Sequence, residues 1–168
     1  PAEATGPDGA MVTLDGTGTL PTAQISTWTG GALTLSGSTS FDFSGLTTFT
    51  TGVISVNQAT SSFPNLNYID GTSLYVSGGS TLALGAVTSY TNLATGNDDY
   101  QTWQASGAGS LLDLQNVTTI TNGTTYDDRL SINALSAGSV DLRKVTQIVD
   151  PATGDQRRRM IGVTADGA

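Results

Sequence analysis

The chain repeats one unusual spacing of apolar residues. In the stretch "LLDLQNVTTITN", residues 111–122, the large apolar residues are Leu112, Leu114, Val117 and Ile120, at offsets of 0, 2, 5 and 8. A strand with one buried face would keep a spacing of two, and a helix would mix spacings of three and four. The pattern therefore predicts two short strands joined by a sharp bend, with all four side chains turned toward one interior.

Five other segments carry these four offsets, and a short alternating strand precedes every copy. The six copies cover 20–28, 41–49, 61–69, 82–90, 112–120 and 140–148. The preceding strands begin at residues 12, 33, 54, 74, 103, 132 and 161, so their start-to-start spacings are 21, 21, 20, 29, 29 and 29.

Repeats of this length, with about three short strands and no helical stretch, are typical of a parallel β-solenoid. The composition agrees, because 28 Thr, 17 Ser and 21 Gly favour strands and bends, whereas the chain has only one Glu and one Lys. We therefore expect an all-β fold, a right-handed parallel β-helix of about six to seven coils. A leucine-rich-repeat-like solenoid is the alternative, although the asparagine column of that family is missing.

The repeats also predict the domain organisation. Residues 1–9 are interpreted as a linker and residues 10–168 as one solenoid domain. The closing "ADGA" is similar to the start of another turn, so we expect a fragment of a longer array. An open solenoid end exposes unpaired strand edges, which would allow the chain to associate end to end.

Three coils carry extra residues after their third strand, at 93–102, 122–130 and 150–158. Because all three insertions enter at the same corner, we expect a side flap, or a fourth short strand, along one edge. Insertions on one face of a solenoid often carry its binding function. This flap is the first candidate site.

The flap contains an acidic column. Asp98 and Asp99 precede Asp127 and Asp128 by 29 residues, one repeat length, so the two pairs should be neighbours. Like charges placed opposite each other destabilise a sheet, so something should compensate. A bound Ca²⁺ is one solution, because it takes carboxylate and carbonyl oxygens, although the acids lack a calcium-repeat signature.

Arginines offer the other solution to this repulsion. With a repeat of 29 residues, Arg157 would lie over Asp128, while Arg129 and Arg158 would lie over Tyr100. The flap would then be a solvated loop held by Asp–Arg pairs.

A carbohydrate-binding or polysaccharide-cleaving β-helix is the main alternative function. Tyr100, Tyr126 and Trp103 lie near the Asp pairs, and aromatic faces beside carboxylates suit sugars. However, the chain has no His, and its basic pair Arg143–Lys144 is adjacent rather than spaced as in polygalacturonase-like sites. We therefore expect no catalytic residues, with a polysaccharide lyase or hydrolase as the residual possibility.

Outward-facing Thr and Ser residues on the third strands form a second candidate surface. Four coils carry Thr-x-Thr or Ser-x-Thr, which resembles the Thr-x-Thr arrays of β-solenoid ice-binding proteins. Thr is also a good outward strand residue in its own right, and Tyr68-Ile69-Asp70 and Gln147-Ile148-Val149 interrupt the array. The predicted outward residues are Thr27, Thr29, Thr48, Thr50, Thr91, Thr119 and Thr121.

Charge and composition argue against several classes of protein. Residues 1–128 hold ten acids and no Lys or Arg, and the net charge is −8, so binding to nucleic acid is not expected despite "DQRRRM" at 155–160. The chain has no Cys and no His, which excludes thiolate and imidazole metal sites. No apolar run of about 18 residues could span a membrane.

The repeats "GSLLDLQNVTTITN" and "AGSVDLRKVTQI" resemble units of giant bacterial secreted or surface proteins, adhesin-like chains built from degenerate parallel β-helix repeats. The resemblance covers residues 10–168 and includes no catalytic motif. It implies a non-catalytic structural or adhesive module of a large surface, matrix or filament-forming protein, located outside the cell. Surface glycans and other matrix proteins would be its partners.

Overall fold

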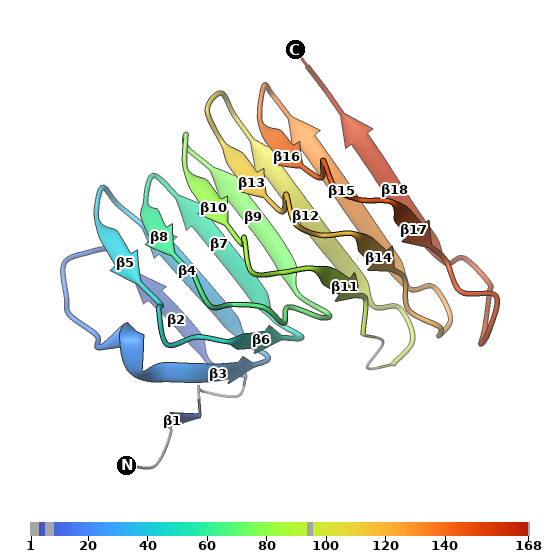
Figure 1. Cartoon of the computed structure of the whole chain (residues 1–168), viewed down its shortest axis with the longest axis horizontal. Coiled ribbons are helices and arrows are strands. Elements are labelled where there is room, and N and C mark those ends of the chain that lie inside the picture. The colour runs from blue at the N-terminus through green and yellow to red at the C-terminus, as the bar shows by residue number, and fades with distance from the viewer. Residues whose placement is uncertain (1–3, 6–8, 94–95, 168) are drawn as a thin grey trace.

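The protein is all-β, with parallel strands arranged in stacked sheets (Figure 1). The computed structural model describes residues 4–5, 9–93 and 96–167. Within these residues the only helical segment is the 3-10 turn η1 (Thr22–Gln24), and no helix is long and apolar enough to cross a membrane. The predicted all-β class and parallel pairing are confirmed, and the absence of α-helix in this part of the chain gives no support to the leucine-rich-repeat alternative.

The largest sheet collects one long strand from each repeat, and all its pairs are parallel. We define a repeat as one long strand and the residues up to the next one. The spatial order β18-β15-β12-β9-β7-β4-β2 follows the chain without exception, so each repeat contacts the repeats before and after it. In chain order these strands are β2 (Met11–Leu14), β4 (Ala32–Ser36), β7 (Val53–Asn57), β9 (Ser73–Ser77), β12 (Tyr100–Ser106), β15 (Arg129–Leu135) and β18 (Met160–Ala165).

Two further sets of short strands complete the repeats. The second set forms one five-stranded sheet, and the third set is divided into two three-stranded sheets. The second set contains β5 (Ser40–Asp42), β8 (Thr60–Ser62), β10 (Thr81–Ala83), β13 (Leu111–Asp113) and β16 (Ser139–Asp141). The third set contains β1 (Ala4–Thr5), β3 (Ile25–Thr29) and β6 (Thr48–Thr50), then β11 (Ser89–Thr91), β14 (Thr119–Thr121) and β17 (Gln147–Val149).

The register of the long strands confirms five of the six spacings expected from the sequence. The inward column runs Val12, Leu33, Ile54, Leu74, Trp103, Ile132 and Val163. The last step was wrong by two residues, because Ile132 pairs with Val163 and not with Ile161. A slip of two preserves the inward and outward alternation of a strand, so the apolar pattern alone could not reveal it.

A β-turn explains the repeated offsets. In all six copies the backbone N–H of the residue at offset 5 donates to the carbonyl at offset 2, as Val117 does to Leu114 at 3.0 Å. Both residues therefore point inward from the two ends of one turn. The outward residue at offset 1 closes three of these turns with its side chain: Asp42, Asp113 and Asp141 each accept from the backbone N–H two residues later.

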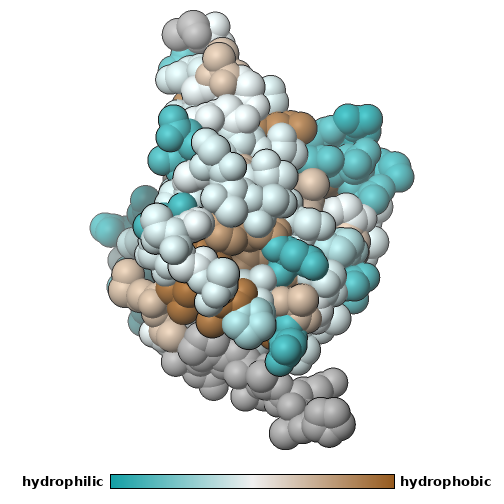
Figure 2. All heavy atoms as spheres, turned by 90° about the vertical axis from the view of Figure 1, so that its left-hand side faces the viewer, coloured by the Kyte–Doolittle hydropathy of each residue, from teal (hydrophilic) through white to brown (hydrophobic). Residues whose placement is uncertain are grey.

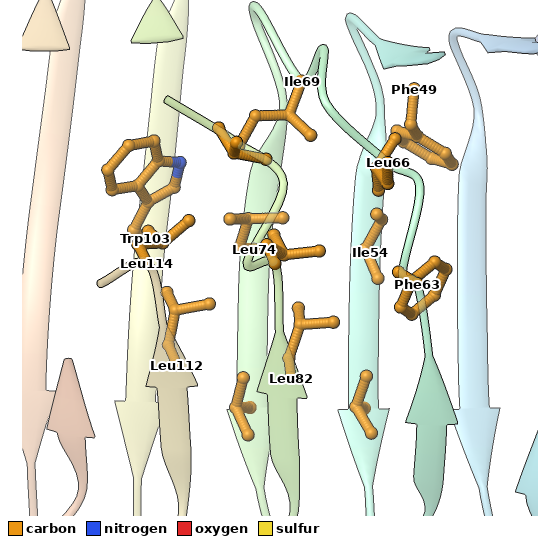
Figure 3. Packing of buried hydrophobic residues seen from close by; sticks show 14 of the residues in the cluster. Phe49, Ile54, Phe63, Leu66, Ile69, Leu74, Leu82, Trp103, Leu112 and Leu114 are labelled. Atoms are coloured by element: carbon orange, nitrogen blue, oxygen red, sulfur yellow. The ribbon is translucent and has the colours of Figure 1, made fainter. Parts of the chain in front are cut away.

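Stacking the repeats produces one continuous apolar core. Figure 3 shows Ile54, Leu74 and Trp103 on neighbouring long strands, with Leu82 and Leu112 on the shorter strands facing them. All five side chains are fully buried. Each such residue loses contact with water only because the next repeat covers it, so the stability of the fold comes from stacking.

The turn after β15 places non-glycine residues in the left-handed region. Ser136 and Ala137 have φ values of 52° and 63°, whereas Gly78 and Gly79 fill the corresponding positions after β9 at 64° and 75°. The left-handed conformation costs an L-residue with a Cβ about 1–2 kcal/mol. We predict that Ala137→Gly raises the free energy of unfolding by about 0.5–1 kcal/mol, after the added chain entropy of glycine is subtracted.

Urea denaturation measures this change. Ala108→Gly is the matched control, because Ala108 is exposed in the equivalent turn after β12 but does not have positive φ. That control should leave stability unchanged or lower it. Equal effects of the two substitutions would contradict the assignment of strain to Ala137.

Tyr90 supplies a second test of the core. Its ring packs edge-on against Trp103 with centroids 4.5 Å apart, while its buried hydroxyl has no hydrogen-bond partner among the described residues. Burial raises the pKa of this phenol far above its ordinary value. Because an unsatisfied buried hydroxyl carries a desolvation cost, we predict that Tyr90→Phe stabilises the fold by about 1 kcal/mol.

Thermal melting of Tyr90→Phe checks this prediction. Tyr100→Phe provides the contrast, since the Tyr100 hydroxyl donates to Asp127 at 2.8 Å and its loss should destabilise the protein. A lower melting temperature for Tyr90→Phe would show that the hydroxyl has a partner, such as an ordered water.

Candidate functional site: the flap edge

The flap edge consists of residues 96–102, 123–131 and 150–160, the described parts of the three insertions and the strand ends that they join. The insertions extend the long strands, so that β12 and β15 have seven residues each where β4, β7 and β9 have five. Tyr100 pairs with Arg129, and Arg129 with Met160, so the insertions lie side by side in register (Figure 1). This confirms that they enter at one corner.

The two-residue slip changes which arginine meets which acid. The backbone N–H groups of Asp98 and Asp127 bond to the carbonyls of Tyr126 and Arg157, so the column is Asp98, Asp127 and Arg158. All three have φ near +60°. Asp and Asn tolerate this left-handed conformation better than other side chains, which accounts for the acids here.

The second flap column is Asp99, Asp128 and Arg159, because Arg129 and Met160 donate to the carbonyls of Asp99 and Asp128. The expectation that Arg157 lies over Asp128 was therefore wrong, and Arg159 takes this place. The expectation that Arg158 lies over Tyr100 was also wrong.

Asp127 lies at the centre of a charge cluster at the flap edge. Its carboxylate accepts from Arg129 Nε at 2.6 Å and from the Tyr100 hydroxyl at 2.8 Å, and the residue is 3% exposed. The same hydroxyl lies 3.4 Å from Asp98 Oδ1, between the two carboxylates. The hydrogen bond from Arg129, and then that from Tyr100, lowers the pKa of Asp127 below its ordinary value.

Asp128 is fully buried, and its carboxylate stabilises the turn that begins at Thr125. It accepts from the backbone N–H of Thr125 at 2.6 Å and from the Thr125 hydroxyl at 2.9 Å. Asp99 holds an equivalent turn, accepting from the N–H of Gly96 at 3.0 Å. Both carboxylates therefore accept hydrogen bonds from nearby backbone N–H groups. These hydrogen bonds offset part of the repulsion between the two negative charges.

The two tyrosines of the flap edge lie beneath arginines. The guanidinium of Arg129 lies 5.3 Å from the ring centre of Tyr100, and those of Arg157 and Arg158 lie 5.1 and 6.0 Å from Tyr126. These are cation–π distances. Arg157 also forms an ion pair with Asp155, and its hydrogen bonds lower the pKa of Asp155 to about 2.

Sequence reasoning missed Arg159, the buried arginine of the flap edge. Its side chain is 1% exposed, lies 3.5 Å from Asp150 and donates to the carbonyls of Gly123 and Thr153 at 3.0 Å. It also donates to Pro151. A basic triplet in an acidic chain gave no indication of which arginine would turn inward.

A buried amide ladder was missed as well. Asn92 Nδ2 donates to Asn122 Oδ1 at 3.1 Å, and Asn122 Nδ2 donates to Asp150 Oδ1 at 3.2 Å. Both asparagines are fully buried. The sequence does contain a signal, because "YTN", "ITN" and "IVD" end the third strands of three consecutive repeats.

Two residues that were expected at a binding surface are buried. Trp103 is fully buried and donates to the carbonyl of Thr72, so it is not available to a sugar. Thr50 is 7% exposed rather than outward on an open face.

The Thr residues of the predicted outward face lie in two separate sheets, and in each sheet they stack on residues of the neighbouring repeat. Thr27 pairs with Thr48 and Thr29 with Thr50, while Thr119 and Thr121 pair with Ser89 and Thr91. Tyr68 lies after the first of these sheets, with only an isolated bridge to Thr48. Ice binding stays a prediction for a face that is interrupted.

The chemistry available at the flap edge is mainly structural. Among the described residues, no group of three or more acidic side chains could hold a metal ion. Asp127 and Asp128, two of the four acids in the predicted cation site, already accept at least two hydrogen bonds each. Calcium binding stays a prediction without support from this geometry.

The ion pair of Asp127 predicts a pH-dependent contribution to stability. Because its pKa is lowered in the folded state, the stabilising effect is present above the ordinary carboxyl pKa of about 4 and disappears as the pH falls through the lowered value. Asp127→Asn should therefore lower the melting temperature at pH 7, and the difference from the unsubstituted protein should shrink toward pH 2.

Asp42→Asn is the matched control, since Asp42 accepts only a backbone N–H in the described structure and has no arginine partner there. A constant difference for Asp127→Asn from pH 7 to pH 2 would contradict the role of the ion pair. A melting temperature that rises on addition of Ca²⁺, and no longer rises in Asp127→Asn, would support the cation site instead.

Comparison of the chain with known protein families gave no match. Curated proteins and solved structures gave none either. The function proposed below therefore depends on the sequence and the geometry of this chain.

Proposed function

We propose that the chain is a non-catalytic structural module: a right-handed parallel β-helix of about six to seven coils that serves as a rigid segment of a large extracellular surface or matrix protein. The right hand follows from the general rule that strand–crossover–parallel strand connections are almost always right-handed.

The self-contained pairing of the flap edge is the observation that carries the proposal. Asp127, Arg129 and Tyr100 bind one another, while Asp128 and Arg159 bind backbone groups. A general acid or base needs a free proton-transfer position within reach of a substrate. These charged groups are instead engaged in holding adjacent insertions together, as expected of a structural edge.

The seven-stranded sheet also supports a structural role. Its in-register pairing runs from β2 to β18, and the inward column beneath it is fully buried through the middle repeats. Repeats that bind only their neighbours form a continuous body without internal hinges. Such a body is suited to holding other parts of a protein at a fixed distance.

The surface composition is consistent with an exposed location. The chain contains 28 Thr and 17 Ser, no Cys, and charged residues make up 12% of it. Hydroxyl-rich faces with few charges remain hydrated through neutral hydrogen bonds. Of the partners expected from the sequence, other matrix proteins are the ones that such a module would meet.

Three measurements on the whole chain test the proposal. Small-angle X-ray scattering should fit the stacked sheets as one rigid body. A glycan array and assays on acidic polysaccharides should show neither binding nor turnover, because the faces of Tyr100 and Tyr126 already lie against arginines. Antibody labelling of intact source cells should detect the chain at the surface.

Other results would support a different function or contradict the proposed one. A glycan hit that is lost in Tyr126→Ala would indicate a carbohydrate-binding solenoid, and polysaccharide cleavage would indicate an enzyme. Thermal hysteresis that is lost when Thr119 is replaced by a bulky residue would indicate ice binding. An intracellular location would contradict the proposed setting.

A further inference from the structure

The third set of strands is interrupted in the middle of the stack. β6 ends one three-stranded sheet and β11 begins the other, and residues 68–70 run between them without forming a strand (Figure 1). This segment still pairs with the repeat before it, because Thr51 donates to the carbonyl of Asp70 at 3.1 Å. The break lies between repeats that are covered on both sides, so it does not depend on where the chain begins or ends.

At this break a carboxylate takes the place of a backbone carbonyl. The carbonyl of Ile69 accepts from the N–H of Thr72 at 3.1 Å, within a turn, instead of pairing with the next repeat. The backbone N–H of Thr91 in that repeat donates to Asp70 Oδ1 at 2.7 Å. The side chain of Asp70 therefore joins two repeats where the sheet is broken, and this position leaves the residue 8% exposed.

Asp70 carries a negative charge that no basic residue offsets. Residues 1–128 contain no Lys or Arg, and no ion pair among the described residues includes Asp70. Burial raises the pKa of its carboxyl group, and hydrogen bonds from the Thr91 N–H and the Tyr68 hydroxyl offset only part of this effect. A carboxylate that has lost most of its water without gaining a cation is stabilised when a cation is supplied.

Tyr68 places an uncovered aromatic ring beside this carboxylate. The residue is 45% exposed, whereas the rings of Tyr100 and Tyr126 lie beneath arginines. Among the described residues, no arginine or lysine lies over the ring of Tyr68.

The surroundings of this pair favour the approach of a cation. Figure 2, which faces the end that holds the first repeats, shows a mostly weakly polar surface around a small apolar patch, with strongly hydrophilic residues in separate groups. Residues 1–128 contain ten acids and no base. A positively charged segment that approaches this part of the molecule therefore meets attraction and no opposing charge.

The flap edge shows what a tyrosine and a carboxylate in this arrangement bind. There the Tyr100 hydroxyl donates to Asp127 at 2.8 Å, Arg129 Nε donates to the same carboxylate at 2.6 Å, and the Arg129 guanidinium lies 5.3 Å from the Tyr100 ring centre. Asp127 is 3% exposed with its arginine in place, so the 8% exposure of Asp70 is compatible with the same pairing. Tyr68 and Asp70 thus provide the tyrosine and the carboxylate of this cluster without the arginine.

We propose that Tyr68 and Asp70 form a docking site for an arginine side chain of a partner protein. The guanidinium lies over the Tyr68 ring and donates to the Asp70 carboxylate, as Arg129 does within the chain. A planar guanidinium makes both contacts at once, whereas the ammonium group of lysine is a strongly hydrated point charge. The partner segment is basic around this arginine, because residues 1–128 carry only acids.

This docking site goes beyond the proposed scaffold role, because a rigid segment needs no bound arginine. It gives a chemical basis for attachment to another matrix protein: an exposed arginine in a basic segment. The two proposals are judged by different measurements, since scattering reports rigidity and a titration reports binding.

NMR titration of the isotope-labelled whole chain with a capped Gly-Arg-Gly peptide tests the docking site. The largest shift changes should fall on the amides of Tyr68, Asp70 and Thr91, because the Thr91 N–H donates to the carboxylate that the guanidinium joins. Capped Gly-Lys-Gly should bind more weakly, and capped Gly-citrulline-Gly, which keeps the shape without the charge, should not bind. Equal affinity for the arginine and lysine peptides would overturn the proposed recognition of arginine.

Two variants and two matched controls locate the binding. Asp70→Asn removes the charge but keeps an acceptor for the Thr91 N–H, so the affinity for the arginine peptide should fall about tenfold. Tyr68→Ala removes the ring and should weaken binding about two- to fivefold. Asp42→Asn changes another acid that accepts a backbone N–H, and Tyr75→Ala changes another tyrosine, on β9; both should leave the affinity unchanged.

Thermal melting shows whether each variant is folded, and Tyr68→Ala alters an exposed side chain, so it tests the site even if Asp70→Asn does not fold. Unchanged affinity in either folded variant would overturn the docking site. Shift changes at Tyr68 that appear on raising the protein concentration alone would identify a second copy as the occupant and overturn the choice of a different protein. No binding of the arginine peptide would also overturn the site, while the scattering data would still judge the scaffold role.

Discussion

Each repeat of this protein can bury its apolar residues only against the repeats before and after it. The offsets 0, 2, 5 and 8 place four side chains inside one unit, but a single unit leaves them open to water on two sides. Parallel, in-register stacking closes both sides at once, and it brings equivalent residues into columns. Leu33, Ile54 and Leu74 are fully buried because they lie in the middle of such a column. The fold is therefore a property of the array and not of any one repeat.

The same stacking that joins apolar residues also brings like charges together. Asp98 lies beside Asp127, and Asp99 beside Asp128, at the flap edge. The chain resolves this conflict locally: Arg129 and Tyr100 bind Asp127, and backbone N–H groups bind Asp99 and Asp128. Charges that satisfy each other in this way stabilise the insertions. The geometry of the stack therefore accounts for the position of these acids.

Much of the fold could be predicted from the sequence because it depends on periodicity. The turn between Leu114 and Val117 and the position of each long strand as far as β15 follow from the apolar spacing. The position of β18 could not be predicted, because a slip of two residues keeps every side chain on its expected face. The flap edge was less predictable still. Whether Arg157 or Arg159 turns inward depends on that slip, and the burial of Thr50 depends on neighbouring repeats rather than on its own strand.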